Sequence, residues 1–268
     1  MTQRFNMRNP HLFRRAICFS STVSLLLLLG PSSLADYHPS GSSDRLGAEI
    51  QTTVGGGRVY IPPPNSQTSG ESHTGGGVRG CGEDMAALAP RLHAMGQTVS
   101  THPTFVWYVF SDDAEPIEFH LYRHQADGSL EAVLMNSIGP SNEGYMAYTL
   151  PQDEPDLSVG DTYLWQVVMY CDQNLEEVGR WTSADIKVVE PPANLAAELP
   201  DHSLQKAQAY AHTGLWYDAM AEVYDATILE EQTFRQNLLL DLADLEEQPD
   251  KEMAVDLSAQ LRQIAEIQ

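Results

Sequence analysis

Histidines and carboxylates are the side chains whose spacing first suggests chemistry in this chain. His120 and His124 are separated by four positions, a spacing at which two imidazoles on a helix can bind one metal ion. The residues around them, Phe119 to Tyr122, are typical of a strand, on which four residues span about 13 Å. We therefore assign both histidines to surface or cross-strand roles. His202 and His212 stand at opposite ends of a predicted helix, with no third ligand nearby in the sequence.

Two acidic segments, residues 112–115 and 152–156, are the next candidates. Both fall between predicted strands, and neither has the spaced ligands and turn glycine of a known calcium loop. We interpret these acidic side chains as charged loop residues that are exposed to solvent. The chain also contains no Gly-x-Ser-x-Gly element, which is the nucleophile motif of α/β-hydrolases. The sequence therefore predicts no catalytic, cofactor-binding or metal-binding residue, and no cofactor.

The first 35 residues predict a cleavable export signal. They carry four arginines and no acidic residue, followed by an apolar stretch over residues 16–30 and small residues at Ser33 and Ala35. This arrangement is typical of a signal peptide cleaved after Ala35. The apolar stretch is shorter than the ~20 residues that span a bilayer, which favours cleavage over an anchor. Arg14-Arg15 leaves the twin-arginine route open.

Charge limits the class of partner. The chain has 15 basic and 37 acidic residues, and removal of the four arginines before residue 36 leaves 11 basic residues and a formal net charge of −26. So acidic a protein repels phosphate backbones and anionic lipid heads. We expect no nucleic-acid partner. No second apolar run is long enough to span a membrane, so we expect no membrane span in the mature chain.

Two cysteines, Cys81 and Cys171, remain once Cys18 leaves with the signal. An even number of cysteines in an oxidising compartment favours a disulfide. We predict an intramolecular Cys81–Cys171 bond. Two buried thiols that never meet, or a bridge between chains, are the alternatives.

A polar linker, residues 36–80, precedes the folded part of the chain. It holds two Gly-Gly-Gly triplets, Pro62-Pro63-Pro64 and many serines and threonines, with too few apolar residues to offset the entropy of ordering. Residues 82–96 then carry a short helical pattern broken by Pro90. Strand patterns follow over residues 104–110, 117–124, 130–138, 144–150, 162–171 and 178–189. Their spacing predicts an antiparallel β-sandwich over residues 81–192.

Tyr163 sharpens this prediction. Leu157, Gly160 and Tyr163 lead directly into a strand, and these offsets resemble the tyrosine corner of fibronectin type III domains. In such a corner the tyrosine hydroxyl bonds to backbone where the chain crosses between sheets. The resemblance implies an immunoglobulin/fibronectin-like topology and a structural role for Tyr163.

Helical periodicity begins after Glu190-Pro191-Pro192 and predicts a subdomain over residues 193–268. A first helix ends at Gly214, a second begins at Trp216, and two more follow around residues 234–245 and 249–264. Gly214 is expected to have positive φ between two antiparallel helices. The first two helices have the spacing of a single tetratricopeptide unit, which leaves two interpretations: a hairpin packed on the sandwich, or a peptide-binding groove. We expect the many acidic residues here on the wet faces of the helices.

The order of landmarks resembles the cyanobacterial domain of unknown function 928 family over nearly the whole mature chain. The landmarks are Arg79-Gly80-Cys81, Ala86-Ala87-Leu88-Ala89-Pro90, His102-Pro103-Thr104-Phe105, Gly160-Asp161-Thr162-Tyr163-Leu164-Trp165, Cys171-Asp172, Gly179-Arg180-Trp181 and Gly214-Leu215-Trp216-Tyr217-Asp218-Ala219. The resemblance implies an exported protein and brings no established activity.

Together these observations predict an exported, non-enzymatic interaction or assembly protein of the cell envelope, periplasmic or secreted, whose partner is a protein. The alternative is a hydrolase or a divalent-metal-binding protein that uses loop carboxylates and histidines.

Overall fold

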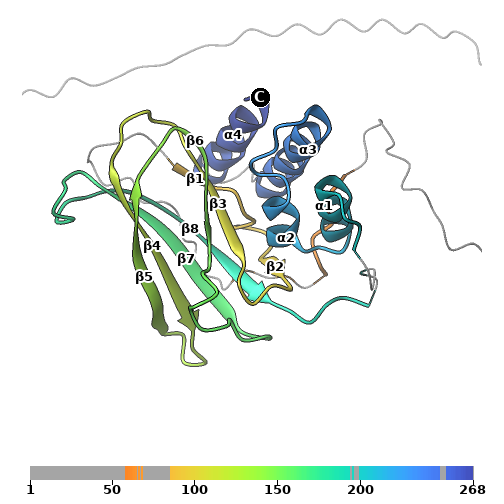
Figure 1. Cartoon of the computed structure of the whole chain (residues 1–268), viewed down its shortest axis with the longest axis horizontal. Helices are drawn as coiled ribbons and strands as arrows, with labels where there is room; N and C mark the ends of the chain where they lie inside the picture. Colours follow the sequence, from red (N-terminus) through yellow and green to blue (C-terminus); the bar gives the residue numbers. More distant parts are fainter. Residues whose placement is uncertain are drawn as a thin grey trace, which may run out of the picture. The chain divides into compact units, whose positions relative to one another are not determined.

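Strands precede helices along the chain in the computed structural model (Figure 1), which describes residues 58–64, 66, 68, 85–193, 195, 199–247 and 252–267. The predicted signal, Cys81 and most of the predicted linker lie outside these residues. The strands are β1 (Met85–Ala87), β2 (Gly96–Thr98), β3 (Thr104–Val109), β4 (Pro116–His124), β5 (Leu130–Pro140), β6 (Gly144–Thr149), β7 (Thr162–Tyr170) and β8 (Val178–Val188). The helices are α1 (Ser203–His212), α2 (Trp216–Ala221), α3 (Leu229–Glu246) and α4 (Glu252–Glu266).

The strands form two sheets, one with the order β1-β3-β6 and one with the order β2-β8-β7-β4-β5. All paired neighbours are antiparallel except β2 and β8, which run parallel with Gly96 opposite Ile186. The prediction of a wholly antiparallel arrangement is therefore wrong for this pair. The reason is that β2 was not recognised as a strand, so its pairing with the last strand could not be anticipated.

The core lies between the two sheets and is rich in aromatic rings. Alternation along β4 directs Ile117, Phe119 and Leu121 inward, where all three are fully buried, as period-2 patterning requires. The Phe119 ring lies 4.9 Å from Phe105 of β3 and 4.4 Å from Tyr148 of β6, centroid to centroid. These contacts join the five-stranded sheet to the three-stranded one.

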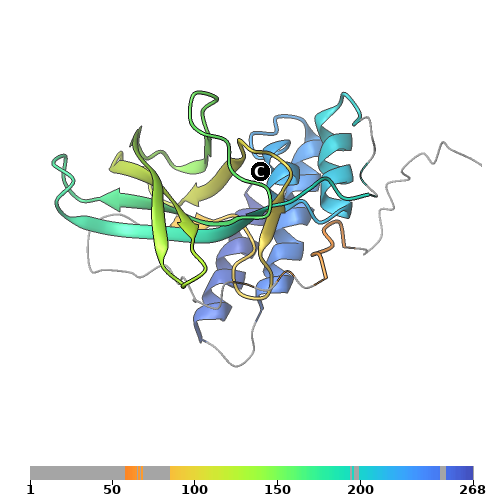
Figure 2. The same cartoon turned by 90° about the horizontal axis from the view of Figure 1, so that it is seen from below.

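The helices pack against the sheets in the same compact unit, which spans Thr53–Gln268. Helix α2 contacts β2 and β3, and α4 contacts β1, as both views indicate (Figures 1 and 2). The Tyr217 hydroxyl on α2 accepts a hydrogen bond from Trp165 Nε1 at 2.7 Å and donates one to the Asp185 carbonyl at 2.8 Å. The predicted boundary at residue 192 falls between β8 and α1, and the two parts share buried contacts across it.

The strands predicted from residue 104 onward agree with β3 to β8 within two residues at each end. The helix predicted over residues 82–96 is wrong, because β1 lies within that range and β2 begins at its end, at Gly96. Met85–Ala87 pairs with β3, and Thr182 Oγ1 accepts the Ala87 N–H at 2.9 Å. Tertiary pairing thus overrides a weak local pattern. None of the helices in the described residues is long and apolar enough to cross a membrane.

Candidate functional site

A row of polar side chains lies on the outer face of β4, opposite the core. Glu118, His120 and Tyr122 alternate with the buried residues of that strand. His120 Nε2 lies 2.9 Å from Glu118 Oε2, and the Tyr122 hydroxyl lies 3.3 Å from His120 Nδ1. Tyr170 of β7 donates to the same Glu118 oxygen at 2.9 Å. The bond with His120 lowers the pKa of Glu118, whereas burial and then Glu118 raise the pKa of Tyr170 to about 12.

His124 belongs to a different pair at the end of the same strand. Its Nε2 lies 2.9 Å from Asp185 Oδ1 on β8. His120 and His124 therefore have separate carboxylate partners, in agreement with the surface and cross-strand roles predicted for them. The two pairs do not converge on one point. Among the residues that the structure describes, no three His, Cys, Asp or Glu side chains form a set that could hold a metal ion.

The other histidines and the two acidic loops named in the sequence analysis lie elsewhere in the fold. His202 occupies the N-cap position of α1 without a side-chain cap bond, and His212 lies in the last turn of that helix. In the first acidic loop, Glu115 N–H donates to Ser141 Oγ at 3.0 Å. In the second, the Asp156 carboxylate lies 3.5 Å from His102 and is 75% exposed. Neither loop, both of which lie within the described residues, supplies a group of three carboxylates or histidines that could hold a metal ion.

Tyr163 and Cys171 are the structural residues of the sheet region that were singled out from the sequence. The Tyr163 hydroxyl accepts the Ser158 N–H at 3.0 Å, and the side chain is buried. Cys171, directly after β7, is disulfide-bonded. Its expected partner Cys81 lies outside the described residues, so the Cys81–Cys171 pairing stays a prediction.

The helical region holds a feature that sequence reasoning missed. Residues 58–64, here called the strap, lie against the helices (orange in Figure 2), although the whole of 36–80 was predicted to be a disordered linker. Asp241 Oδ2 of α3 accepts the N–H groups of Val59 at 2.6 Å and Tyr60 at 2.9 Å. Ile61 N–H donates to the Ala211 carbonyl of α1 at 3.4 Å. For these residues the linker prediction is wrong, because a few specific contacts order the segment despite its sparse apolar content.

Tyr60 provides the buried side-chain contact between the strap and the helices. Its side chain is 1% exposed, and its ring meets that of Trp216 edge-on with centroids 4.8 Å apart. Trp216 is itself held by a bond from its Nε1 to the Leu88 carbonyl at 2.8 Å. The only sequence signal for this contact is the apolar run Val59-Tyr60-Ile61 beside the prolines.

Gly214, between α1 and α2, lets the strap approach closely. Its φ is +83°, a conformation that glycine adopts without steric cost. A Cβ at this position would lie 2.6 Å from Pro63 Cγ and 3.1 Å from the Ile61 carbonyl oxygen. Gly214 therefore serves two purposes, the turn between helices and the seating of the strap.

Buried carboxylates join the helices to other segments in the same way. Glu246 of α3 accepts the N–H groups of Arg91 and Leu92, both at 2.8 Å. Asp218 of α2 accepts hydrogen bonds from the Thr98 hydroxyl and the Val99 N–H, both at 3.1 Å. Burial raises the pKa of Glu246 to about 7 and that of Asp218 to about 6. The prediction that acidic residues here line wet helix faces is wrong for these two.

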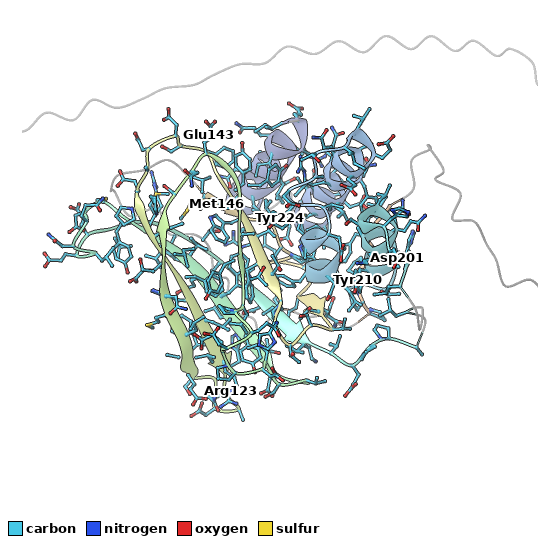
Figure 3. All side chains as sticks on the ribbon, in the orientation of Figure 1. Arg123, Glu143, Met146, Asp201, Tyr210 and Tyr224 are labelled. Atoms are coloured by element: carbon cyan, nitrogen blue, oxygen red, sulfur yellow. The ribbon has the colours of Figure 1, made fainter. Side chains whose placement is uncertain are left out.

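A shallow depression lies between β6 and helices α3 and α4. Its lining includes Tyr145, Leu229, Arg235 and Ile267. The Arg235 guanidinium stacks 4.2 Å from the Tyr145 ring centroid and donates to the Tyr224 carbonyl at 2.7 Å. Met146 on β6 and Tyr224 after α2, both labelled in Figure 3, pack partly buried against the core. The arginine has structural partners on this face, so the depression offers no free charge.

Three comparisons with known proteins bear on this geometry. The model of a protein family described as a Domain of Unknown Function (DUF928) matches residues 74–252, which confirms the resemblance inferred from the sequence. No curated protein matches the chain. Among solved structures, a lytic polysaccharide monooxygenase important for chitin utilisation in Cellvibrio japonicus is similar at 12% identity and a TM-score of 0.26. That match covers 38% of this chain and 58% of the other, and a likeness at that score carries no argument.

Proposed function

The chain belongs to the DUF928 family, and we propose that it is an exported, non-enzymatic protein of the cell envelope, periplasmic or secreted, that binds other polypeptides. The observation that carries the proposal is the strap. A segment without helix or strand lies on three helices, held by backbone hydrogen bonds to Asp241 and by an aromatic residue in a buried slot. Backbone bonds combined with a side-chain pocket are the usual means of recognising a peptide.

Two further observations support the proposal. The arginine-rich, then apolar N-terminus supports export, and the acidic composition favours protein partners over nucleic acid.

For the two sheets we propose an immunoglobulin-like topology. The hydrogen bond from Ser158 N–H to the Tyr163 hydroxyl supports it, because a tyrosine corner makes this kind of bond.

Site-specific photo-cross-linking in the native envelope tests the proposed function. A photoreactive group replaces His212, an exposed residue at the end of α1 close to the strap, or Met135, 55% exposed on the five-stranded sheet, as the matched control. We expect a discrete polypeptide adduct from position 212 and little from position 135. Equal labelling from both positions, no adduct from either, or stoichiometric tightly held metal in the purified protein would contradict the proposal.

A further inference from the structure

The strap is bound as a ligand would be. The backbone N–H groups of Val59, Tyr60 and Ile61 each have an acceptor: the first two donate to Asp241 Oδ2, and the third donates to the Ala211 carbonyl. The residues that follow, Pro62, Pro63 and Pro64, have no N–H to satisfy, and their φ is fixed near −65°. Little conformational entropy is therefore lost when such a segment binds. Ile61 remains 54% exposed, so the contact depends on the Tyr60 ring, the backbone and the prolines.

The slot for Tyr60 is matched to the ring but not to its hydroxyl. Within the described part of the chain, the buried Tyr60 hydroxyl has no hydrogen-bond partner. A buried polar group without a partner carries a desolvation penalty that the same ring without the hydroxyl would not carry. The strap is thus a weakened occupant of its own site, and a segment with phenylalanine at this point would fit better.

We propose that this site, formed by Asp241, Trp216, Gly214 and Ala211, also binds a segment of a partner protein, and that the strap is the competitor within the chain. The partner segment has an apolar residue, an aromatic residue without a hydroxyl, an apolar residue and then prolines. This inference rests on the proposed function and specifies its partner. The partner segment displaces the strap. Two of its backbone N–H groups donate to the Asp241 carboxylate, and its prolines pack against Gly214, where any residue other than glycine would clash with them.

The probes are two synthetic peptides, Arg-Val-Tyr-Ile-Pro-Pro-Pro with the sequence of residues 58–64, and the same peptide with phenylalanine in place of tyrosine. Calorimetric titration into the full chain and into Tyr60→Ala, which empties the slot, gives the affinities. We expect both peptides to bind Tyr60→Ala, the phenylalanine peptide about tenfold tighter because it buries no unpaired hydroxyl. A scrambled peptide is the control.

Tyr60→Phe and hydrogen exchange keep the test informative should Tyr60→Ala fold poorly. Tyr60→Phe makes the strap a better competitor, so the phenylalanine peptide should bind this variant about tenfold more weakly than it binds the unchanged chain. In the unchanged chain, an excess of the phenylalanine peptide should accelerate hydrogen exchange of the Val59 and Tyr60 amides. These amides lose their hydrogen bonds to Asp241 when the peptide displaces the strap.

Three results would overturn the inference: no binding to folded Tyr60→Ala, equal binding to Tyr60→Phe and the unchanged chain, or unaltered exchange of those two amides. Dimers of Tyr60→Phe in sedimentation, formed by exchange of straps, would show that a second copy is the occupant and would also overturn it. A failed titration beside a discrete adduct from position 212 rejects the peptide chemistry alone, whereas loss of the adduct rejects the proposed function.

Discussion

The sheet region and the helical region are stabilised by different kinds of contact. Between the sheets the buried contacts are aromatic and aliphatic, with Phe105, Phe119 and Trp165 at the centre. The helices instead hold their neighbours through carboxylates, Asp218, Asp241 and Glu246, each accepting two donors from segments distant in sequence. The difference teaches that an acidic protein can use its carboxylates as internal anchors. It also predicts that the two regions respond differently to mutation and pH.

The largest effect is expected from the disulfide at the end of β7. A Cys81–Cys171 bond closes a loop of about 90 residues, for which chain entropy gives about 4–5 kcal/mol. Reduction should lower the free energy of unfolding by that order, measured by urea denaturation with and without reductant. Thiol titration of the unfolded, unreduced mature protein should find no free thiol. Two thiols per chain would refute the pairing.

Truncation of an aromatic core residue comes next. Phe119→Ala leaves a cavity among Phe105, Tyr148 and Trp165 and should cost about 3–5 kcal/mol. Met135→Ala, on the outer face of the same sheet, should change stability by less than about 0.5 kcal/mol. Far-ultraviolet and near-ultraviolet circular dichroism during urea denaturation follow both regions. Because Tyr217 links helix and sheet, we expect a single transition, and helices that outlast the sheets would argue against that link.

Glu246→Gln probes the carboxylate anchors. An amide offers one oxygen to two N–H donors, so one donor is left unpaired at a cost of about 1–3 kcal/mol. Glu247→Gln, at an exposed neighbouring position, is the control and should be nearly neutral.

The same variant tests the pH dependence. The pKa of Glu246 is raised in the folded protein to about 7 and that of Asp218 to about 6. A carboxyl group with a raised pKa binds more protons in the folded state than in the unfolded state. The stabilisation that each of these two groups adds to the folded state is therefore complete below about pH 4, and it is lost as the pH rises to about 7. The unchanged chain should lose stability over that range, and Glu246→Gln should lose less. A slope identical in both proteins would show that Glu246 does not titrate there.

Gly214→Ala tests the close approach of the strap, with Gly160→Ala as a matched control. Both glycines have positive φ, +83° and +94°, so both alanines carry about 1–2 kcal/mol of backbone strain. Only at Gly214 would the added Cβ meet other atoms, those of Pro63 and Ile61. We expect Gly214→Ala to be the more destabilising by about 1 kcal/mol, and to expose the Val59 and Tyr60 amides to hydrogen exchange. Equal effects would show that the strap yields without cost.

Tyr163→Phe should have the smallest effect. The variant removes the hydroxyl that accepts the Ser158 N–H, and because Ser158 is exposed, water can replace that acceptor. We expect a loss of about 1 kcal/mol in urea denaturation. Tyr122→Phe, whose hydroxyl makes only a 3.3 Å contact with His120, should lose less. A larger loss in the control would remove the support for a tyrosine corner.

Sequence periodicity was sufficient to predict what apolar burial determines. Alternation in residues 117–124 and the helical spacing of Phe234, Leu238 and Leu242 identified β4 and α3 correctly. Sequence periodicity was insufficient where one or two polar contacts determine the position of a segment. Nothing in the sequence distinguishes Asp241 from the exposed Asp244, since only the tertiary fold brings the strap to one of them. The same holds for β2, three residues long, whose pairing depends on a strand far along the chain.

The parallel pair of β2 and β8 has a consequence for the order in which the chain folds. Gly96 pairs with Ile186, about 90 residues later. The strap cannot form its hydrogen bonds to Asp241 until α3, which is later still in the sequence, is present. The strap and β2 therefore acquire these partners only after α3 and β8, respectively, are available. Contacts of such long sequence separation slow folding, because loop closure must precede the contact. If the chain is exported from its N-terminus, as proposed, we expect β2 and the strap to stay without these partners until β8 and α3 have been translocated.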